Sequence, residues 1–306
     1  MTFSLEASYA ECERLTRSQA GNFYYSFLVL PRAKQRAMSA LYAFLRRTDD
    51  LSDSHEPVET RRAQLAEWRA ALDAALAGEF RSPLLPALAD TVTRYAIPVE
   101  HLRAAIDGVE QDLDPRVYHT FDELADYCHL VASAVGLACI HIWGFRGGEA
   151  IAPAKACGIA FQLTNILRDL KEDAARGRVY LPQENLERFD YTADDLLANV
   201  IDGRFRALMR FEMARAEEHY RRAAELERWL EPDGRRIFGA MTAIYHSLLD
   251  EIRRRDGDIF GPRVRLSAWR KLSIAAVWLV RESPLVAWGW PAARGGRANL
   301  AMRGER

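Results

Sequence analysis

Two pairs of aspartates are the residues of this 306-residue chain whose type and spacing most clearly suggest chemistry. Asp49 and Asp53 form the first pair, and Asp169 and Asp173 form the second. Residues four positions apart lie one above the other on a helix, where two carboxylates repel each other. A divalent cation would offset this repulsion, and Mg²⁺ prefers oxygen ligands while it keeps waters and phosphate oxygens. The two pairs therefore predict a Mg²⁺ site, which Mn²⁺ could also occupy.

The first pair ends a stretch that carries one polar stripe. At about 100° per residue, Tyr42, Arg46, Asp49 and Asp53 fall within roughly 60° of one another on a helix. Taken alone, this segment is equally compatible with a solvated helix end, because 28% of the chain is charged. The second acidic segment is what favours a metal site.

Amides precede the second pair on the same helical face. Gln162 and Asn165 line up with Asp169 and Asp173, and amides that are buried require hydrogen-bond partners. An ordinary amphipathic helix would carry charged residues at those two positions. Basic residues surround both pairs, and this mixture of charges suits an anionic diphosphate that is bridged by Mg²⁺. These basic residues are Arg46, Arg47, Arg168, Lys171, Arg176 and Arg178.

The composition excludes several other classes of protein. With 42 basic and 43 acidic residues the net charge is −1, so no general basic field exists to bind nucleic acid. The four cysteines form neither a CxxC pair nor a zinc-ligand pattern, which indicates reduced thiols and a cytoplasmic protein. No glycine-rich dinucleotide motif follows a strand pattern, and the use of NADPH stays open.

Helical periodicity dominates the chain, and no run of alternating strand pattern is convincing. We expect one all-α domain over residues 1–290 and a disordered tail over residues 291–306. The apolar stretch 272–290 is interrupted, and its clean run of 274–280 is far shorter than the roughly 20 residues of a membrane-spanning helix. It predicts a core helix or a helix that docks on a surface, with peripheral contact to the inner face of the membrane as one outcome. Helices are expected near residues 4–20, 32–53, 58–78, 84–96, 98–112, 121–144, 150–174, 203–229 and 232–255.

Five blocks of the sequence, taken in order, resemble the squalene/phytoene synthase family. This resemblance runs from about residue 8 to about residue 270, and it is more specific than either acidic motif alone. It implies the all-α isoprenoid-synthase bundle, a central apolar cavity and two prenyl diphosphate substrates. The blocks are residues 23–31, 49–53, 127–136, 165–173 and 178–182.

The resemblance also implies roles for individual residues. Asp49, Asp53, Asp169 and Asp173 become the metal-binding acids, and Tyr127 lies near the reacting carbons, where it orients the leaving diphosphate or shuttles a proton. Diphosphate contacts are expected from Arg46, Arg168, Arg178 and Arg263. The polar end of the site is expected to include Tyr42, Gln162, Asn165 and Tyr180. The hydrocarbon pocket is expected to include Phe23, Phe27, Val131 and Val135.

The implied activity is the head-to-head joining of two prenyl diphosphates through a cyclopropyl intermediate. The Phe-Tyr-Tyr start at residue 23 and the segment 131–136 resemble bacterial enzymes that form presqualene diphosphate, so two farnesyl diphosphates are the expected substrates, with presqualene diphosphate or squalene as product. The alternatives are a phytoene synthase acting on two geranylgeranyl diphosphates, a head-to-tail prenyltransferase or terpene cyclase, and a non-enzymatic scaffold. The scaffold is disfavoured because all four acids are present. The oligomeric state stays open.

Overall fold

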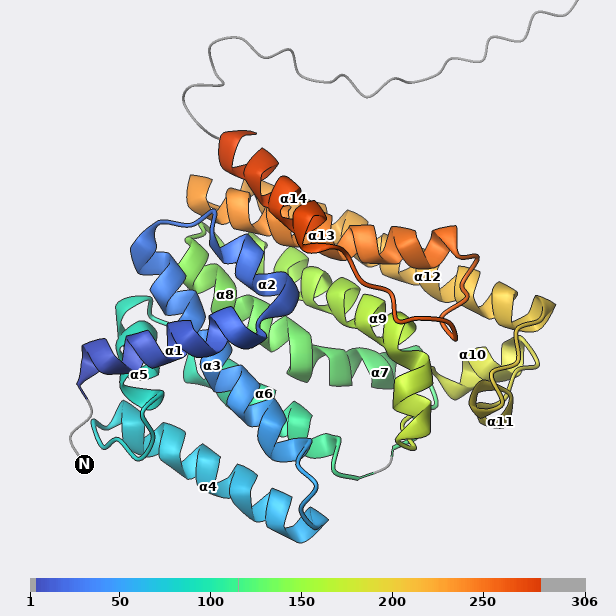
Figure 1. Ribbon diagram of the computed structural model, residues 1–306, viewed down its shortest axis with the longest axis horizontal. Helices are drawn as coiled ribbons and strands as arrows, with labels where there is room; N and C mark the ends of the chain where they lie inside the picture. The colour runs from blue at the N-terminus through green and yellow to red at the C-terminus, as the bar shows by residue number, and fades with distance from the viewer. Residues whose placement is uncertain (1–3, 115, 282–306) are drawn as a thin grey trace, which may run out of the picture.

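Helices form the whole architecture in the computed structural model, which describes residues 4–114 and 116–281 (Figure 1). The expected all-α fold is confirmed, and the described residues contain two isolated β-bridges but no strand. The long helices match the expected positions within a few residues. They are α1 (Leu5–Gln19), α3 (Arg32–Ser52), α4 (Val58–Leu76), α5 (Leu85–Arg94), α6 (Val99–Gln111), α9 (Ile151–Ala175), α12 (Gly203–Ala223) and α13 (Pro232–Arg254).

The structure differs from the sequence expectation in its short and irregular elements. The helix expected over 121–144 consists of α7 (Phe121–Cys128), a π-helical turn η1 (His129–Ser133) and α8 (Ala134–Trp143). A 3₁₀ turn, η3 (Ala224–Arg228), continues α12, and another, η2 (Gly148–Ala150), precedes α9. Three short helices were not expected, because five to seven residues show too little periodicity: α2 (Gly21–Phe27), α10 (Gln183–Arg188) and α11 (Ala193–Leu197).

The last described helix is α14 (Ala268–Arg281). It begins before the apolar stretch 272–290, and it packs against α13 and α2. The expected tail over 291–306 lies outside the described residues. The disorder expected for these residues stays a prediction.

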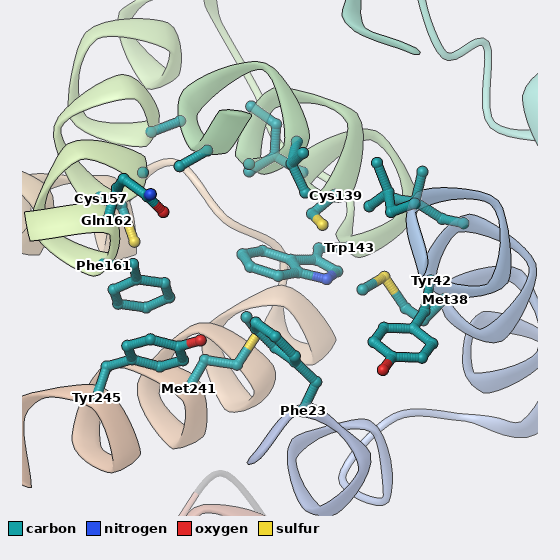
Figure 2. A pocket seen from close by; sticks show the side chains of 18 of the residues that line it. Phe23, Met38, Tyr42, Cys139, Trp143, Cys157, Phe161, Gln162, Met241 and Tyr245 are labelled. Carbon is teal, nitrogen blue, oxygen red and sulfur yellow. The ribbon is translucent and has the colours of Figure 1, made fainter. Parts of the chain in front are cut away.

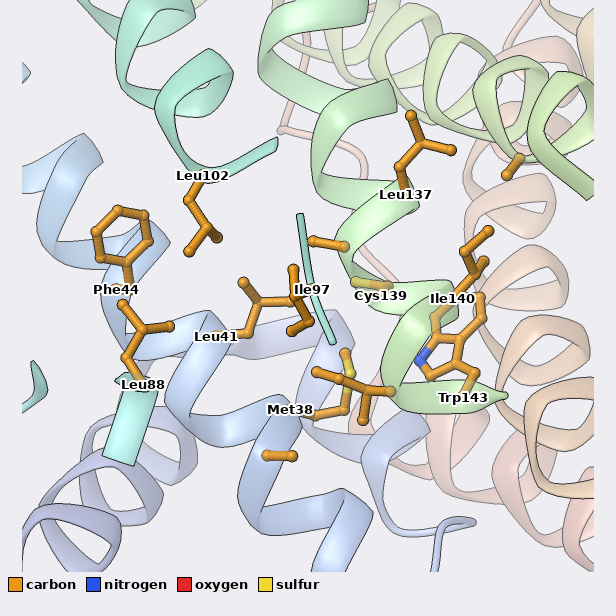
Figure 3. Close-up of a cluster of buried hydrophobic side chains, with 14 of the residues drawn as sticks. Met38, Leu41, Phe44, Leu88, Ile97, Leu102, Leu137, Cys139, Ile140 and Trp143 are labelled. Carbon is orange, nitrogen blue, oxygen red and sulfur yellow. The ribbon is translucent and has the colours of Figure 1, made fainter. Parts of the chain in front are cut away.

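Buried side chains from several helices fill the centre of the bundle. Figure 3 shows Leu41 and Phe44 of α3 facing Leu88 of α5 and Leu102 of α6, with Leu137 of α8 at the other side of the same cluster. Among the described residues, two segments are long and apolar enough to cross a membrane by length and composition, Phe121–Trp143 and Gly148–Ala175. In the bundle 50% and 61% of these windows are buried, so they serve as its central helices. They position the candidate site from the inside.

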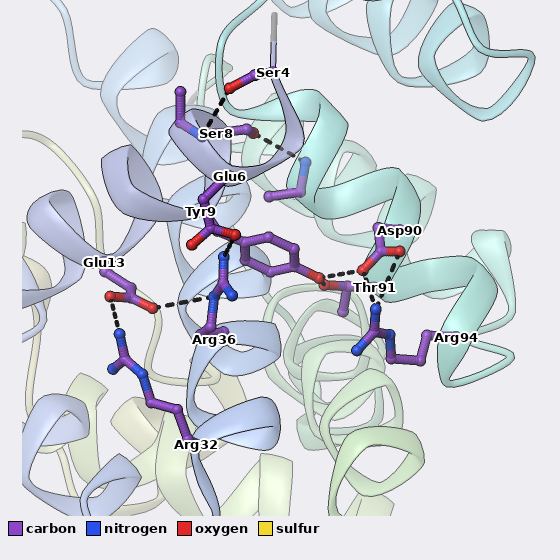
Figure 4. A network of polar contacts seen from close by, with 12 residues as sticks. Ser4, Glu6, Ser8, Tyr9, Glu13, Arg32, Arg36, Asp90, Thr91 and Arg94 are labelled. Atoms are coloured by element: carbon purple, nitrogen blue, oxygen red, sulfur yellow. Dashed lines mark hydrogen bonds and ion pairs between the residues drawn. The ribbon is translucent and has the colours of Figure 1, made fainter.

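Polar contacts tie α1 to the outside of the bundle (Figure 4). Tyr9 donates a hydrogen bond to Asp90 of α5 at 2.6 Å, and burial raises the pKa of Tyr9 to about 12. Glu13 pairs with Arg32 at 2.6 Å and with Arg36 at 3.5 Å, both on α3. These contacts fix the first turns of α3, the helix whose last turn carries the first acidic pair.

The two central helices approach each other at Gly158 of α9. A Cβ atom at this position would lie 2.5 Å from the Cα atom of Ser133, which belongs to the π-helical turn. Gly158→Ala should therefore force α9 away from this turn and lower the free energy of unfolding by about 1–3 kcal/mol. Denaturant titration of both proteins measures the effect. An unchanged midpoint would show that the backbone yields at this crossing without cost.

Candidate active site

The ends of α3 and α9 bring both acidic pairs to one cleft. Asp49 lies in the last turn of α3, and Asp53 caps its C-terminus. Asp169 and Asp173 lie on the final turns of α9. The cleft is open to solvent at Asp49 and Asp53, which are exposed, and Asp169 and Asp173 are partly buried. Its lining includes Tyr42, Arg46, Asp49, Asp53, Tyr127, Val131, Val135, Gln162, Asn165, Arg168, Asp169, Asp173, Arg178, Tyr180 and Arg263.

Two of the four acids are destabilised as carboxylates. The protein around Asp49 excludes enough water to raise the pKa of this carboxyl to about 7, and the charges of Asp53 and Asp50 add to the effect, although its side chain still faces the open cleft. Partial burial, followed by repulsion from Asp169, raises the pKa of Asp173 to about 7 as well. Carboxyl groups whose negative charge is unfavourable in this way are suited to bind a cation, which would stabilise the charge.

Asp169 is different, because two arginines hold it as a carboxylate. Arg168 donates to it at 2.8 Å, and Arg263 donates to both of its oxygens at 2.7 Å. Burial would raise the pKa of Asp169, but these hydrogen bonds outweigh burial and hold the pKa below its usual value. Part of the expected arginine set is thus bound to an acid before any substrate is present.

The remaining arginines line the other side of the cleft. Arg46 pairs with Asp50 one turn further along α3. The guanidinium of Arg178 lies 3.6 Å from Asp53 and also donates to the backbone carbonyl of Asp112 at 3.1 Å. The loop that carries Arg178 therefore connects the ends of α3 and α6.

Asp112, which follows α6, is a cleft residue that the sequence did not reveal. It accepts hydrogen bonds at 3.0 Å from the hydroxyl groups of both Tyr127 and Tyr180. The two phenol rings stack with their centroids 5.2 Å apart. Burial raises the pKa of Tyr127 well above its usual value, and the carboxylate of Asp112 adds to this. Tyr127 therefore stays a neutral phenol, which can donate a hydrogen bond but is a poor base.

An apolar pocket continues from the cleft into the bundle, and Figure 2 shows several aromatic side chains facing it. Phe161 and Tyr245 stack with centroids 4.2 Å apart, and Phe23 lies 5.7 Å from Tyr245 and 6.3 Å from Tyr42. Of the expected pocket residues, Phe23, Val131 and Val135 line both spaces, and Phe27 lines the inner pocket alone. Tyr245 of α13 was not anticipated from the sequence.

A family model described as squalene/phytoene synthase matches residues 16–270. The chain belongs to this family. Among curated proteins it is 39% identical to a 15-cis-phytoene synthase of Synechococcus elongatus, over 92% of this chain and 96% of the relative. It is 37% identical to a phytoene synthase of Mycobacterium tuberculosis, over 90% and 91% of the two chains. Both relatives are named phytoene synthases, which corresponds to the first of the alternative functions given above.

Solved structures give the same family with other names. A dehydrosqualene synthase in complex with ligand superposes with a TM-score of 0.82 at 28% identity, covering 90% of this chain and 96% of that one. The squalene synthase HpnC from Alicyclobacillus acidocaldarius gives 0.77 at 31% identity, covering 82% and 95%. The expected family and the isoprenoid-synthase fold are thereby confirmed, with head-to-head prenyl condensation as the class of reaction.

The side chains of the cleft can be compared with the ligands that a divalent cation prefers. Within residues 4–114 and 116–281, no three His, Cys, Asp or Glu side chains lie close enough together to hold an ion by themselves. The oxygen donors that line the cleft are carboxylates, amides and hydroxyl groups, with no thiol or imidazole among the lining side chains. Such a set suits Mg²⁺ that takes its remaining ligands from water and from diphosphate oxygens.

Proposed function

We propose that this enzyme joins two farnesyl diphosphates head to head and forms presqualene diphosphate. The inner end of the apolar pocket carries this proposal. Phe27, Met38 and Trp143 line this pocket but not the polar cleft, and their exposures are only 4%, 3% and 3%. Three bulky, buried side chains leave less length for hydrocarbon than small residues would. This favours a C15 chain over a C20 chain.

The reaction breaks the bond between C1 and oxygen of one substrate, which releases diphosphate and leaves an allylic cation. The double bond of the second substrate attacks the cation, and loss of one proton closes the cyclopropane ring. Arg46 and Arg178 bind the diphosphate as it departs, and a bound Mg²⁺ supplies further positive charge there. Phe23 and Tyr245 present aromatic faces that stabilise a cation. The apolar pocket excludes the water that would trap it.

Tyr127 has a defined part in this scheme. Because its pKa is raised well above the usual value, Tyr127 is not assigned the role of a base. Its single hydroxyl proton is donated to Asp112 before substrate binds, and we assign it to turn from Asp112 to the diphosphate when the substrate is present. Asp112 orients the phenol, since it accepts from both Tyr127 and Tyr180 at 3.0 Å. Of the two roles that the resemblance left open, the orienting one is favoured.

Activity should require Mg²⁺ or Mn²⁺. The carboxylate-lined cleft and the absence of soft ligands in it predict that a chelator abolishes turnover and that added Mg²⁺ restores it. Calorimetric titration should show Mg²⁺ binding much more tightly in the presence of inorganic diphosphate than in its absence. Full turnover in excess chelator would refute the metal assignment.

Phe27→Ala should enlarge the inner end of the pocket. Phe27 lies four residues after Phe23 along the same face of α2 and is buried at the pocket wall. We expect the ratio of kcat/KM for the C15 substrate to that for the C20 substrate to fall by about tenfold, the scale that a few methylenes command in an apolar pocket. An unchanged ratio would show that Phe27 does not limit the length of the substrate chain.

A phytoene synthase acting on two geranylgeranyl diphosphates is the second candidate. The specific observation in its favour is that the curated relatives quoted above, at 39% and 37% identity, are both phytoene synthases. Incubating the enzyme with each diphosphate alone, with and without NADPH, decides between the candidates. Product from the C20 substrate alone would establish the second one. Squalene that forms only when NADPH is added would show that the reaction continues by hydride transfer.

A further inference from the structure

The outward face of α14 is unusually apolar for a protein surface. Trp269 is 82% exposed, Val277 is 61% exposed and Val280 is 55% exposed. Leu272 and Leu279 flank them at 37% and 48%. Of the ten large hydrophobic side chains exposed among the described residues, these five lie on this one helix. A contiguous apolar patch of this kind marks an interaction site rather than ordinary surface.

The opposite face of α14 is already bound to the bundle. Ala275 is buried, and Trp278 packs so closely over Gly239 of α13 that a Cβ atom there would lie 2.3 Å from the indole ring. Ile274 packs against the core on the same side. The helix therefore has two apolar faces, of which the fold uses one. Figure 1 shows α14 at the edge of the molecule, beside α13.

The charged residues of the segment 263–280, which comprises most of α14 and the residues before it, have a single sign. Residues 263–280 contain four basic side chains and no acidic one. Arg263 pairs with Asp169, whereas Arg265 and Arg270 are exposed and have no ion-pair partner in the part of the chain that the structure describes. Exposed cations beside exposed aromatic and aliphatic side chains are the pattern of a helix that lies in a membrane interface.

The position of α14 connects this face to the active site. Residues 263–266, which lead into the helix, line the polar cleft. The helices that α14 covers, α2 and α13, supply Phe23 and Tyr245 to the apolar pocket. We propose that the outer face of α14, with Arg265 and Arg270, docks on an anionic lipid bilayer and places the pocket next to the membrane. A hydrocarbon substrate or product would then move between pocket and lipid with little exposure to water.

Two other occupants would use the same apolar face but not the unpaired cations. If two copies of the chain met through this face, each would present the same basic residues to the other. The repulsion of like charges would oppose such a dimer. Residues 282–306 of this chain carry four basic residues against two acidic ones, so their net charge does not complement Arg265 and Arg270. Charge complementarity therefore favours an anionic surface.

Co-sedimentation with vesicles tests the proposal on the full-length chain. The vesicles contain phosphatidylcholine alone, or phosphatidylcholine with about a third phosphatidylglycerol. We expect at least tenfold stronger binding to the anionic vesicles at low ionic strength, weakened by added salt. The double variant Val277→Asp/Val280→Asp should lose this binding by tenfold or more, and Arg270→Glu should weaken it severalfold. Leu197→Asp, at an exposed leucine on α11, is the matched control and should bind as the unmodified chain does.

Turnover of detergent-dispersed substrate should be unchanged in the double variant, because neither valine lines the cleft or the pocket. If that variant fails to fold, Trp269→Ser serves instead, since this side chain is 82% exposed. The proposal is overturned if the unmodified chain ignores anionic vesicles or binds neutral ones equally. It is also overturned if the variants split a dimer, or lower the melting temperature, while vesicle binding stays the same.

Discussion

Asp173→Asn should lower turnover by roughly a thousandfold while it stabilises the metal-free protein. The amide keeps the shape of the side chain, so no cavity opens. It cannot supply the negative charge that holds a cation and the diphosphate, and this loss acts on the transition state. In chelator the same change removes a carboxylate that burial and Asp169 disfavour. We expect the free energy of unfolding in chelator at pH 8 to rise by about 1–2 kcal/mol.

The sign of the pH dependence follows from the raised pKa of Asp173. In the unfolded chain this group titrates near its ordinary value of 3.8, and in the folded protein near 7. Below the ordinary value the group is protonated in both states and costs nothing. As the pH rises toward 7, folding must hold back an ionisation that the unfolded chain allows, so the metal-free protein loses stability. The advantage of Asp173→Asn should therefore be largest at pH 8 and should vanish near pH 4.

Thermal melts in chelator at both pH values, together with initial rates in Mg²⁺, measure this prediction. Glu172→Gln is the matched control, because Glu172 is an exposed neighbour on α9 that does not line the cleft. It removes the same charge from the same turn of the helix and should change neither quantity appreciably. A variant of Asp173 that melts lower and keeps near-normal turnover would identify this aspartate as a structural residue.

The acidic pairs could be predicted from the sequence because each lies within one helix. Local periodicity alone places Asp49 near Asp53 and Asp169 near Asp173, whatever the rest of the fold does. The lengths of α3 and α9 and the all-α class rest on the same local signal. The family was predicted from five short sequence blocks that resemble it.

Contacts between distant segments could not be predicted in the same way. Asp112 gains its role only because Tyr127 and Tyr180 reach it, the latter from 68 residues away. Nothing in the pattern around residue 112 distinguishes it from a solvated residue after a helix. The sequence pattern likewise predicts that Tyr245 is an ordinary core residue of α13, and only the structure shows that it stacks with Phe161. The short helix α2, which carries Phe23, has too few residues for periodicity to detect.

The four acids are alike in sequence, but the structure predicts opposite effects on stability for two of them. Asp169→Asn should destabilise the metal-free protein as well as abolish most turnover. Asp169 accepts from Arg168 and from Arg263, which lies 94 residues away. The side chains of Asp169 and Arg168 are only 16% and 12% exposed, so removing the carboxylate leaves a poorly hydrated cation without its partner. We expect the free energy of unfolding in chelator to fall by about 1–3 kcal/mol.

The carboxylate of Asp169 should affect stability with the opposite sign to that of Asp173. Ionisation of Asp169 stabilises the folded protein, whereas ionisation of Asp173 destabilises it. Because the arginines lower the pKa of Asp169 in the folded protein, its carboxylate contributes stability above its ordinary value of 3.8, and this contribution is lost as the pH falls through the lowered value. The difference between Asp169→Asn and the unmodified chain should therefore persist at pH 8 and shrink in acid. A double-mutant cycle with Arg263→Gln, followed by melts in chelator, measures the part carried by that ion pair. Additive effects of the two changes, with no coupling, would show that Asp169 and Arg263 do not stabilise each other in solution, and the stabilisation of this carboxylate would then rest on Arg168.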